Sequence, residues 1–434
     1  MIKVKLKKIL NRKGVKGASR ALVPGIGSLC GYIILLVCMA LGMGILVSCS
    51  HNDEPVSKPK EAKRTVLVYA IASNNLWSDF RSDRAEMLSG LENVNLDDKR
   101  LLVYWVSPTH GLSEDDKDPE TGNPFPPALY EVELDKTTGE LSFVILKTYT
   151  RSVYSTDPKR MSAVIADAMA AAPSQRYGLV LWSHGLGWLP ATHTTRSSDV
   201  STRRGPALHS FGYDEELQGI GEMDIDELAS AIPDNMFDYI WFDACYMTGI
   251  ETIYQLRNKC GTLVGYPTEI WSGGMPYEMV IGTLMSEDPN LSEAADKVFE
   301  YYASAGWPAT VSVISMSGIE QLADAVKDIY AHGVTLDYEE IYALQYYSRN
   351  TKYPFYDLGQ YTLKLAEKLP EEYTVALRSA LDKTVIYKAI TPLSFDRRPF
   401  SQEAYSGLST HVWRGDGSDA ETFYSTLDWY QRVY

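Results

Sequence analysis

The sequence predicts an α/β sandwich built on a mostly parallel sheet, because two observations agree. Six apolar runs have the length of strands, and their apolarity is continuous rather than alternating, as in strands covered on both faces. Amphipathic stretches lie between several of these runs, and strands that alternate with helices are typical of the α/β class. The expected strands are 65–71, 101–106, 177–182, 237–242, 262–266 and 310–314, and the expected helices are 159–171, 224–231 and 249–258.

Two parts of the chain depart from this alternation. Residues 128–148 alternate in polarity around the turn sequence 135–139, which predicts a β-hairpin. Beyond residue 334 the pattern becomes more helical, so we expect a helical C-terminal region, 336–434, either separate from a catalytic domain at 65–335 or part of it. The elements expected there are helices at 339–348, 358–368, 371–388 and 423–434 and a strand at 408–412.

The N-terminal residues 1–48 have the order of an export signal. Eight basic residues without any acidic one precede the apolar run 29–47, and small residues precede Cys49. The sequence Leu46-Val47-Ser48-Cys49 resembles a bacterial lipobox, which implies that Cys49 is lipidated and becomes the mature N-terminus. The alternative is a single transmembrane helix. Residues 49–64 are polar and indicate a tether, so both interpretations place the body of the protein in the cell envelope, outside the cytoplasm.

Charge excludes one class of partner. The whole chain has a net charge of −15, and without the signal segment 33 basic residues face 56 acidic ones, a net charge of −23. A body this acidic repels a phosphate backbone, so nucleic-acid binding is not expected. The expected partners are peptides or proteins and, through the N-terminal lipid, a membrane.

Cysteine usage singles out a small number of thiols. Cys30 and Cys38 lie in the signal and Cys49 at its end, which leaves Cys245 and Cys260 in the folded part. Two cysteines can form one bridge but no disulfide framework. An unpaired thiol in an exported protein needs a reason, and catalysis is one.

Reactive side chains follow two of the expected strands. His184 comes directly after the strand 177–182 and is followed by glycines, which let backbone amides approach a substrate. Cys245 lies between the strand 237–242 and an expected helix start, where a helix N-terminus lowers the pKa of a thiol. The carboxyl ends of parallel strands meet at one sheet edge, so a Cys–His pair for acyl transfer is expected there.

Each residue alone also has an ordinary structural interpretation. A cysteine after a strand is often a small core residue, and a His-Gly pair is often only part of a loop. The two together, each at the carboxyl end of a strand, make catalysis as well supported as the structural interpretation. The remaining histidines show no metal-ligand spacing, and the chain has no phosphate-binding or dinucleotide-binding motif, so neither a metal nor an organic cofactor is expected.

The two motifs support a family resemblance. His184-Gly185-Leu186-Gly187-Trp188 after one strand and Asp243-Ala244-Cys245 after another resemble the clostripain family of cysteine peptidases. The resemblance implies a caspase-like sandwich, with His184 as general base and Cys245 as nucleophile. It also implies that the Gly185 amide lines the oxyanion hole.

The family resemblance implies a substrate preference through the positions of two acidic residues. In the family, the acid two residues before the nucleophile, here Asp243, helps bind a basic side chain before the scissile bond, and Glu269 is a candidate for the second acid. A charge-paired pocket of this kind favours Arg or Lys. Either carboxylate is alternatively structural.

The family also matures by cutting itself between the two motifs. The long loop 190–212 contains Arg196, Arg203 and Arg204, which are candidate cleavage sites, although these arginines also suit a solvated surface loop. The expected function is therefore an exported cysteine endopeptidase. Alternatives are a non-catalytic caspase-like module that binds peptides or proteins, and a transpeptidase in which an amine replaces water.

Overall fold

The computed structural model describes residues 60–434 except 120, 192–209, 216, 218 and 350–354. The residues of Pro59–Tyr434 form one compact unit. The predicted signal, its lipidation site Cys49 and the candidate cleavage sites Arg196, Arg203 and Arg204 lie outside the described residues. The predicted division near residue 335 stays a prediction.

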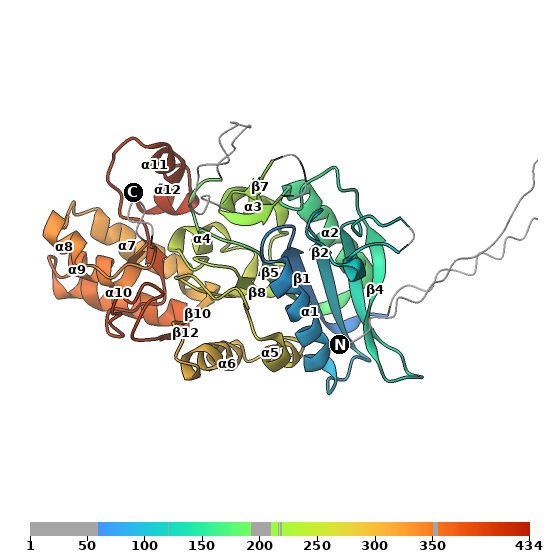
Figure 1. Ribbon diagram of the computed structural model, residues 1–434. Coiled ribbons are helices and arrows are strands. Elements are labelled where there is room, and N and C mark those ends of the chain that lie inside the picture. The colour runs from blue at the N-terminus through green and yellow to red at the C-terminus, as the bar shows by residue number, and fades with distance from the viewer. Residues whose placement is uncertain (1–59, 120, 192–209, 216, 218, 350–354) are drawn as a thin grey trace, which may run out of the picture. The chain divides into compact units, whose positions relative to one another are not determined.

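A nine-stranded sheet forms the centre of this unit (Figure 1), in the order β12-β10-β9-β8-β5-β1-β2-β3-β4. The five strands from β9 to β2 are parallel to their neighbours, and the strands at both ends pair antiparallel. All six predicted strands are present. They are β1 (Ala62–Ile71), β2 (Lys99–Val106), β5 (Ser174–Trp182), β8 (Phe237–Asp243), β9 (Cys260–Gly265) and β10 (Thr310–Ser315).

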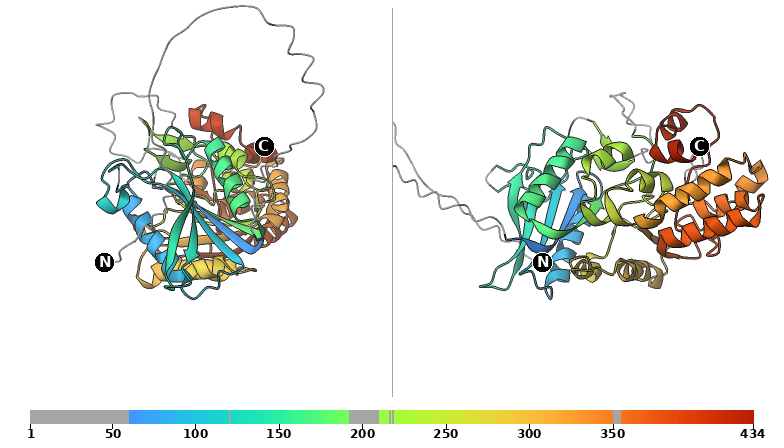
Figure 2. Two further views of the ribbon diagram at one scale, coloured as in Figure 1. Left: turned by 90° about the vertical axis from the view of Figure 1, so that its right-hand side faces the viewer. Right: turned by 180° about the vertical axis from the view of Figure 1, so that it is seen from behind.

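Alternate side chains of the central strands enter two separate cores. In β1, Leu67, Tyr69 and Ile71 belong to one apolar cluster and Val66 and Val68 to the other, and all are fully buried. Because both faces are buried, the strand sequences are continuously apolar. Figures 1 and 2 show the layers: one face is covered by α2 (Pro158–Ala171), α3 (Ile225–Ala231), α4 (Ile250–Gln255) and α7 (Ile319–Tyr330), the other by α1 (Trp77–Leu91), α5 (Tyr277–Leu284) and α6 (Leu291–Ser304).

This arrangement confirms the predicted α/β/α sandwich. The predicted hairpin is also present, as β3 (Ala128–Leu134) and β4 (Leu141–Thr148), which end one edge of the sheet. A small separate ribbon, β6 (Phe211–Asp214) and β7 (Gly221–Met223), follows the loop whose centre is not described.

The C-terminal region differs from prediction in several elements. The helix expected at 371–388 ends at Thr384, and the next six residues form β12 (Val385–Ile390) at the edge of the main sheet. Four of these six residues are β-branched or aromatic, and such residues favour a strand where a paired edge is available. The helix expected at 339–348 stops at Tyr342, the one expected at 423–434 is two short helices, and the strand expected at 408–412 is only two residues long. The elements are α8 (Tyr338–Tyr342), β11 (Tyr356–Asp357), α9 (Leu358–Ala366), α10 (Glu371–Thr384), β13 (Ser409–Thr410), α11 (Asp419–Tyr424) and α12 (Asp428–Val433).

Candidate active site

The two motifs leave the sheet at the same edge, on neighbouring strands. β5 and β8 pair in parallel with Trp182 opposite Asp243, so His184 and Cys245 each follow the paired position by two residues. The Ser183 amide continues this pairing, with its nitrogen 3.4 Å from the Asp243 carbonyl oxygen. The structure therefore brings together the two residues that the sequence placed at strand ends.

Glycines in the His motif allow its backbone to approach the Cys motif. A Cβ atom at Gly185 would lie 2.6 Å from the carbonyl oxygen of Cys245. At Gly187, which has a φ of +61°, a Cβ atom would lie 2.9 Å from the carbonyl oxygen of Tyr246. Real Cβ atoms do not approach backbone oxygens this closely, so side chains at either position would push the two turns apart.

The turn around Cys245 corrects one expectation. The thiol does not lie at a helix N-terminus, because α4 begins only at Ile250, with Gly249 as its N-cap. The intervening turn holds Tyr246 at a φ of +62°, a conformation that costs about 1–3 kcal/mol for a residue with a side chain. Burial, with a smaller contribution from the nearby carboxylates of Glu269 and Asp243, raises the pKa of Cys245 to about 12.

The segment after β9 covers this turn. The Tyr246 amide donates to the Thr268 carbonyl at 2.9 Å, and the Thr248 amide approaches the Tyr266 carbonyl at 3.3 Å. The Ile270 amide donates to the Cys245 sulfur at 3.3 Å, which opposes the effect of burial on the thiol pKa. The nucleophile candidate is therefore partly exposed but capped by a backbone donor.

His184 has an orienting partner that the sequence analysis missed. Its Nε2 lies 2.9 Å from the Oδ1 of Asn75, which follows the end of β1, the strand next to β5. With that oxygen as acceptor, Nε2 carries the proton and Nδ1 is the basic nitrogen. The sequence could have indicated this partner, since the polar residues 73–75 directly follow an apolar strand, as His184 does.

Asp243 is buried, and its carboxylate is hydrogen-bonded to other groups of the protein. It accepts hydrogen bonds from the Met275 amide at 3.0 Å and the Tyr277 hydroxyl at 3.1 Å. A Cβ atom at Gly274, whose φ is +57°, would lie 2.9 Å from this carboxylate. Burial raises the pKa of Asp243 to about 6, while these bonds oppose the shift. In the structure Asp243 thus fixes the segment 274–277, and its predicted contact with substrate stays a prediction.

Glu269, the other candidate substrate-binding acid, is partly exposed and carries an ion pair. Its Oε1 accepts from the Nε of Arg349 at 2.9 Å, and the guanidinium makes a second contact with the same oxygen. The side chain of Glu269 is 19% exposed and that of Arg349 59%. The pair is thus accessible from solvent, directly beside the residue that caps the thiol.

Two small pockets flank the segment 268–271. One is lined by both polar and aromatic groups, including Glu269, Arg349 and Phe395. The other is mainly apolar, with Trp271 and Tyr302 in its wall. Both pockets are lined by Glu269, the residue next to the Ile270 that caps the thiol.

The part of the chain that the structure describes shows neither a cluster of metal ligands nor a helix able to span a membrane. No group of three or more His, Cys, Asp or Glu side chains there is arranged to hold a metal ion. None of the helices in that part of the chain has the length and apolarity needed to cross a membrane.

Comparison with known proteins identifies relatives of this arrangement. A model of the clostripain family matches residues 68–392. Clostripain of Hathewaya histolytica is 25% identical over 285 residues, which cover 62% of this chain and 47% of that protein, so the chain spans about half the length of that relative. A secreted C11 cysteine protease from Bacteroides thetaiotaomicron, solved with an irreversible peptide inhibitor, is 26% identical with a TM-score of 0.70 and covers 86% of this chain and 99% of its own. An inactive zymogen C11 protease from Parabacteroides distasonis is 28% identical with a TM-score of 0.69, covering 87% and 99%.

Proposed function

Since this chain belongs to the clostripain family of cysteine peptidases, we propose that it is an exported endopeptidase with Cys245 as nucleophile and His184 as general base. One observation carries the proposal: Gly185 packs against the Cys245 carbonyl so closely that the His and Cys turns form a single site.

The residues supply a complete acyl-transfer mechanism. Nδ1 of His184 takes the proton of Cys245, and the thiolate attacks the carbonyl carbon of the peptide bond. The amides of Gly185 and Cys245 stabilise the oxyanion that forms. His184 then gives its proton to the leaving amine as the C–N bond breaks. Water, deprotonated by His184, hydrolyses the thioester and releases the acid and the thiol.

Preference for Arg or Lys before the scissile bond belongs to this proposal, with different roles for the two acids. Glu269 is the more accessible of the two acids, and it already binds the guanidinium of Arg349. A substrate Arg or Lys would take the place of that guanidinium. Asp243, which is buried and bonded to the segment 274–277, would act by holding the pocket wall.

Self-processing between the two motifs is also proposed. The loop that contains Arg196, Arg203 and Arg204 starts and ends beside the His motif. The Ala191 amide is bonded to Asp224, and the Ser210 hydroxyl donates to the Gly187 carbonyl at 2.9 Å. A cut in this loop would free the chain next to His184, and the relative from Parabacteroides distasonis was solved as an inactive zymogen. Comparing the intact mass with that of a Cys245→Ala variant tests this, since a cut that persists in the variant excludes self-cleavage.

The proposal that this chain is exported has two supports. These are its signal-like N-terminal segment and the relative from Bacteroides thetaiotaomicron, which is a secreted protease. We propose attachment to the cell envelope through lipid on Cys49. Metabolic labelling with a clickable fatty acid tests it, with Cys49→Ser as control. Label that remains on the variant would contradict it.

The decisive test of activity is cleavage of a fluorogenic peptide library by residues 60–434 beside the Cys245→Ala variant. Cleavage after Arg or Lys that disappears in the variant supports both mechanism and specificity. Cleavage after other residues keeps the mechanism and removes the role of Glu269. Absence of cleavage, before and after limited proteolysis of the 192–209 loop, would favour a peptide-binding module instead.

A further inference from the structure

A segment near the C-terminus contacts both catalytic turns. The Ser409 amide donates to the Thr248 carbonyl at 3.1 Å, in the turn that carries Cys245, and Gly249 and Ser409 form a parallel bridge. The rings of His411 and Tyr424 lie 4.8 and 4.9 Å from the ring of Trp188, the last residue of the His motif. We call Ser409–His411 together with Tyr424 the C-terminal brace.

Glu251 connects this brace to the nucleophile turn. It lies in the first turn of α4 and is fully buried. Its Oε1 accepts hydrogen bonds from the Thr410 hydroxyl at 2.9 Å, the His411 amide at 2.8 Å and the Tyr424 hydroxyl at 3.3 Å. A single carboxylate oxygen therefore gathers three donors from the brace.

A second buried acid holds the brace itself together. Glu421 accepts from the amides of Arg414 and Asp416 at 2.8 and 2.7 Å, and its Oε1 lies 3.1 Å from the Nε2 of His411. His411 and Glu421 are almost completely buried. Trp188 thus packs against a ring whose own position is fixed by hydrogen bonds.

Burying a carboxylate without a cation beside it costs desolvation free energy, so a buried Glu251 is expected only where its hydrogen bonds serve a role. Burial raises its pKa to about 7. Among the described residues its Oε2 has no hydrogen-bond partner, so the hydrogen bonds of this carboxylate to other residues are those of Oε1 with the brace. An apolar residue of similar size would avoid the desolvation and lose only these contacts.

We propose that Glu251 is a positioning residue, which fixes the C-terminal brace across the His and Cys turns and so keeps His184 and Cys245 in reacting geometry. This inference rests on the proposed peptidase function. It explains why a segment more than 160 residues after the nucleophile lies against both motifs.

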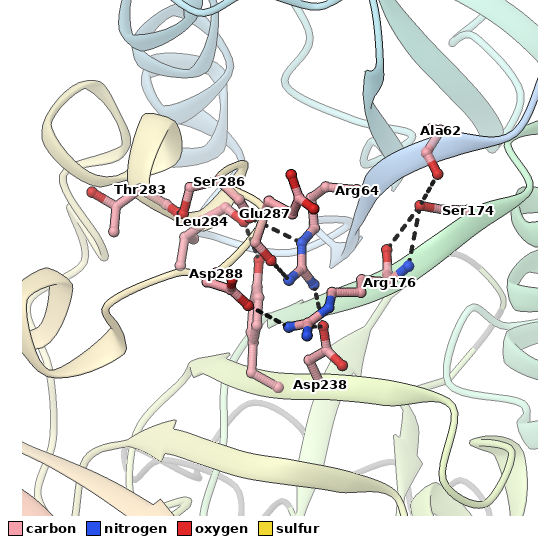
Figure 3. Close-up of polar contacts among 11 residues, drawn as sticks. Ala62, Arg64, Ser174, Arg176, Asp238, Thr283, Leu284, Ser286, Glu287 and Asp288 are labelled. Carbon is pink, nitrogen blue, oxygen red and sulfur yellow. Dashed lines mark hydrogen bonds and ion pairs between the residues drawn. The ribbon is translucent and has the colours of Figure 1, made fainter.

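The test compares the parent full chain with Glu251→Gln, Glu251→Leu and a stability control near the amino end of β1, away from the strand ends that lead to His184 and Cys245. The control is Arg64→Met. Figure 3 shows Arg64 between the Ser286 and Glu287 carbonyls and the Asp238 carboxylate. Its guanidinium forms an ion pair with Asp238, with 2.7 Å between the nitrogen and the carboxylate oxygen. Arg64 is fully buried, so its loss lowers stability without touching either catalytic turn.

We expect Glu251→Leu to lower kcat for peptide cleavage at least tenfold with KM changed less than twofold, at a temperature where the variants are folded. Glu251→Gln, which keeps the accepting oxygen, should stay within threefold of the parent. Arg64→Met should keep its kcat while its unfolding midpoint falls. The proposal would be overturned if Glu251→Leu kept the parental kcat. It would also be overturned if either Glu251→Gln or Arg64→Met lost as much kcat as Glu251→Leu.

A second measurement does not depend on activity. In a Cys245→Ala background, Glu251→Leu should speed amide hydrogen exchange at 185–189 and 246–250 at least fivefold, and unchanged exchange would overturn the brace. If the parent cleaves nothing, the proposed function fails while this test still decides the inference. Should Glu251→Leu not fold, Tyr424→Phe removes one donor, and we expect a two- to fivefold fall in kcat; full kcat in that variant would overturn the proposal.

Discussion

The amide of Ile270 donates a hydrogen bond to the sulfur of Cys245, with 3.3 Å between the two atoms. The contact joins the nucleophile candidate to a segment that also carries Glu269, a candidate substrate-binding acid. Because the thiol lies in a buried setting, its pKa is raised to about 12, and it is neutral at pH 7 in this conformation. The Ile270 amide opposes this shift, because its hydrogen bond favours the thiolate.

The first prediction concerns thiol reactivity. In a Cys260→Ser background, where Cys245 is the only thiol of residues 60–434, alkylation by iodoacetamide should accelerate about tenfold for each pH unit between 7 and 10. The reason is that the thiolate fraction rises by that factor at every pH well below the pKa. The rate is measured by mass spectrometry, with the Cys245→Ala, Cys260→Ser chain as blank. A plateau below pH 9 would show that the thiol pKa is not raised.

The second prediction concerns the contact between the turns. Gly185→Ala should lower kcat at least a hundredfold, because the added Cβ atom would meet the Cys245 carbonyl at 2.6 Å and displace the amides that we propose bind the oxyanion. Gly282→Ala in α5 is the matched control, since its Cβ atom would meet Val94 at 3.4 Å and the Gly90 carbonyl oxygen at 3.8 Å, both ordinary van der Waals contacts. Steady-state kinetics on one peptide compare the two. Near-parental kcat in Gly185→Ala would mean that the two turns do not form one site.

The third prediction concerns the orientation of His184. Asn75→Ala removes the oxygen that lies 2.9 Å from Nε2, so kcat should fall about tenfold with little change in KM. Ser78→Ala, which changes an exposed residue in the first turn of α1, is the control and should leave kcat and KM unchanged. If Asn75→Ala raises KM instead, Asn75 contacts substrate rather than orienting the histidine.

The fourth prediction concerns the Glu269–Arg349 pair. Exposed pairs contribute about 0.2–1 kcal/mol, so Arg349→Ala should free Glu269 and lower KM for Arg-containing peptides by up to about fivefold. Glu269→Gln should raise KM for the same peptides and leave peptides with an apolar residue at that position unchanged. Equal effects of Glu269→Gln on both peptide classes would assign Glu269 a structural role.

The fifth prediction concerns the pH dependence of stability. Burial raises the pKa of Glu251 from 4.5 to about 7, so the folded state binds more protons than the unfolded state between these values. Stability from this group is therefore fully present below pH 4.5 and lost as the pH rises to about 7, by roughly 3 kcal/mol. Glu251→Gln removes the titration. Urea unfolding should show the variant to be more stable than the parent at pH 8, with that advantage smaller by roughly 3 kcal/mol at pH 4.5.

The control for this measurement is Glu293→Gln, which changes an exposed acid of α6. Its difference from the parent should not vary with pH by a comparable amount. A constant difference between Glu251→Gln and the parent from pH 4.5 to 8 would show that Glu251 titrates normally.

Strands and the residues that follow them were predictable because their signals are local. A continuous apolar run specifies a strand buried on both faces, so the six strands and the places of His184 and Cys245 at their ends needed no tertiary information. Where packing decided the outcome, prediction failed. The pattern after Thr384 continues a helix, but a free sheet edge made it β12.

The sequence by itself determined the fold class and the two motifs that we propose carry the chemistry, because both depend on residues close together in the chain. Only the tertiary structure decided which groups surround them. Glu269 meets Arg349 from 80 residues away, and Glu251 meets His411 from 160 residues away. The Cys245 thiol meets the Ile270 amide instead of a helix N-terminus. Such contacts arise when distant segments pack together, and no local pattern of residue types specifies them.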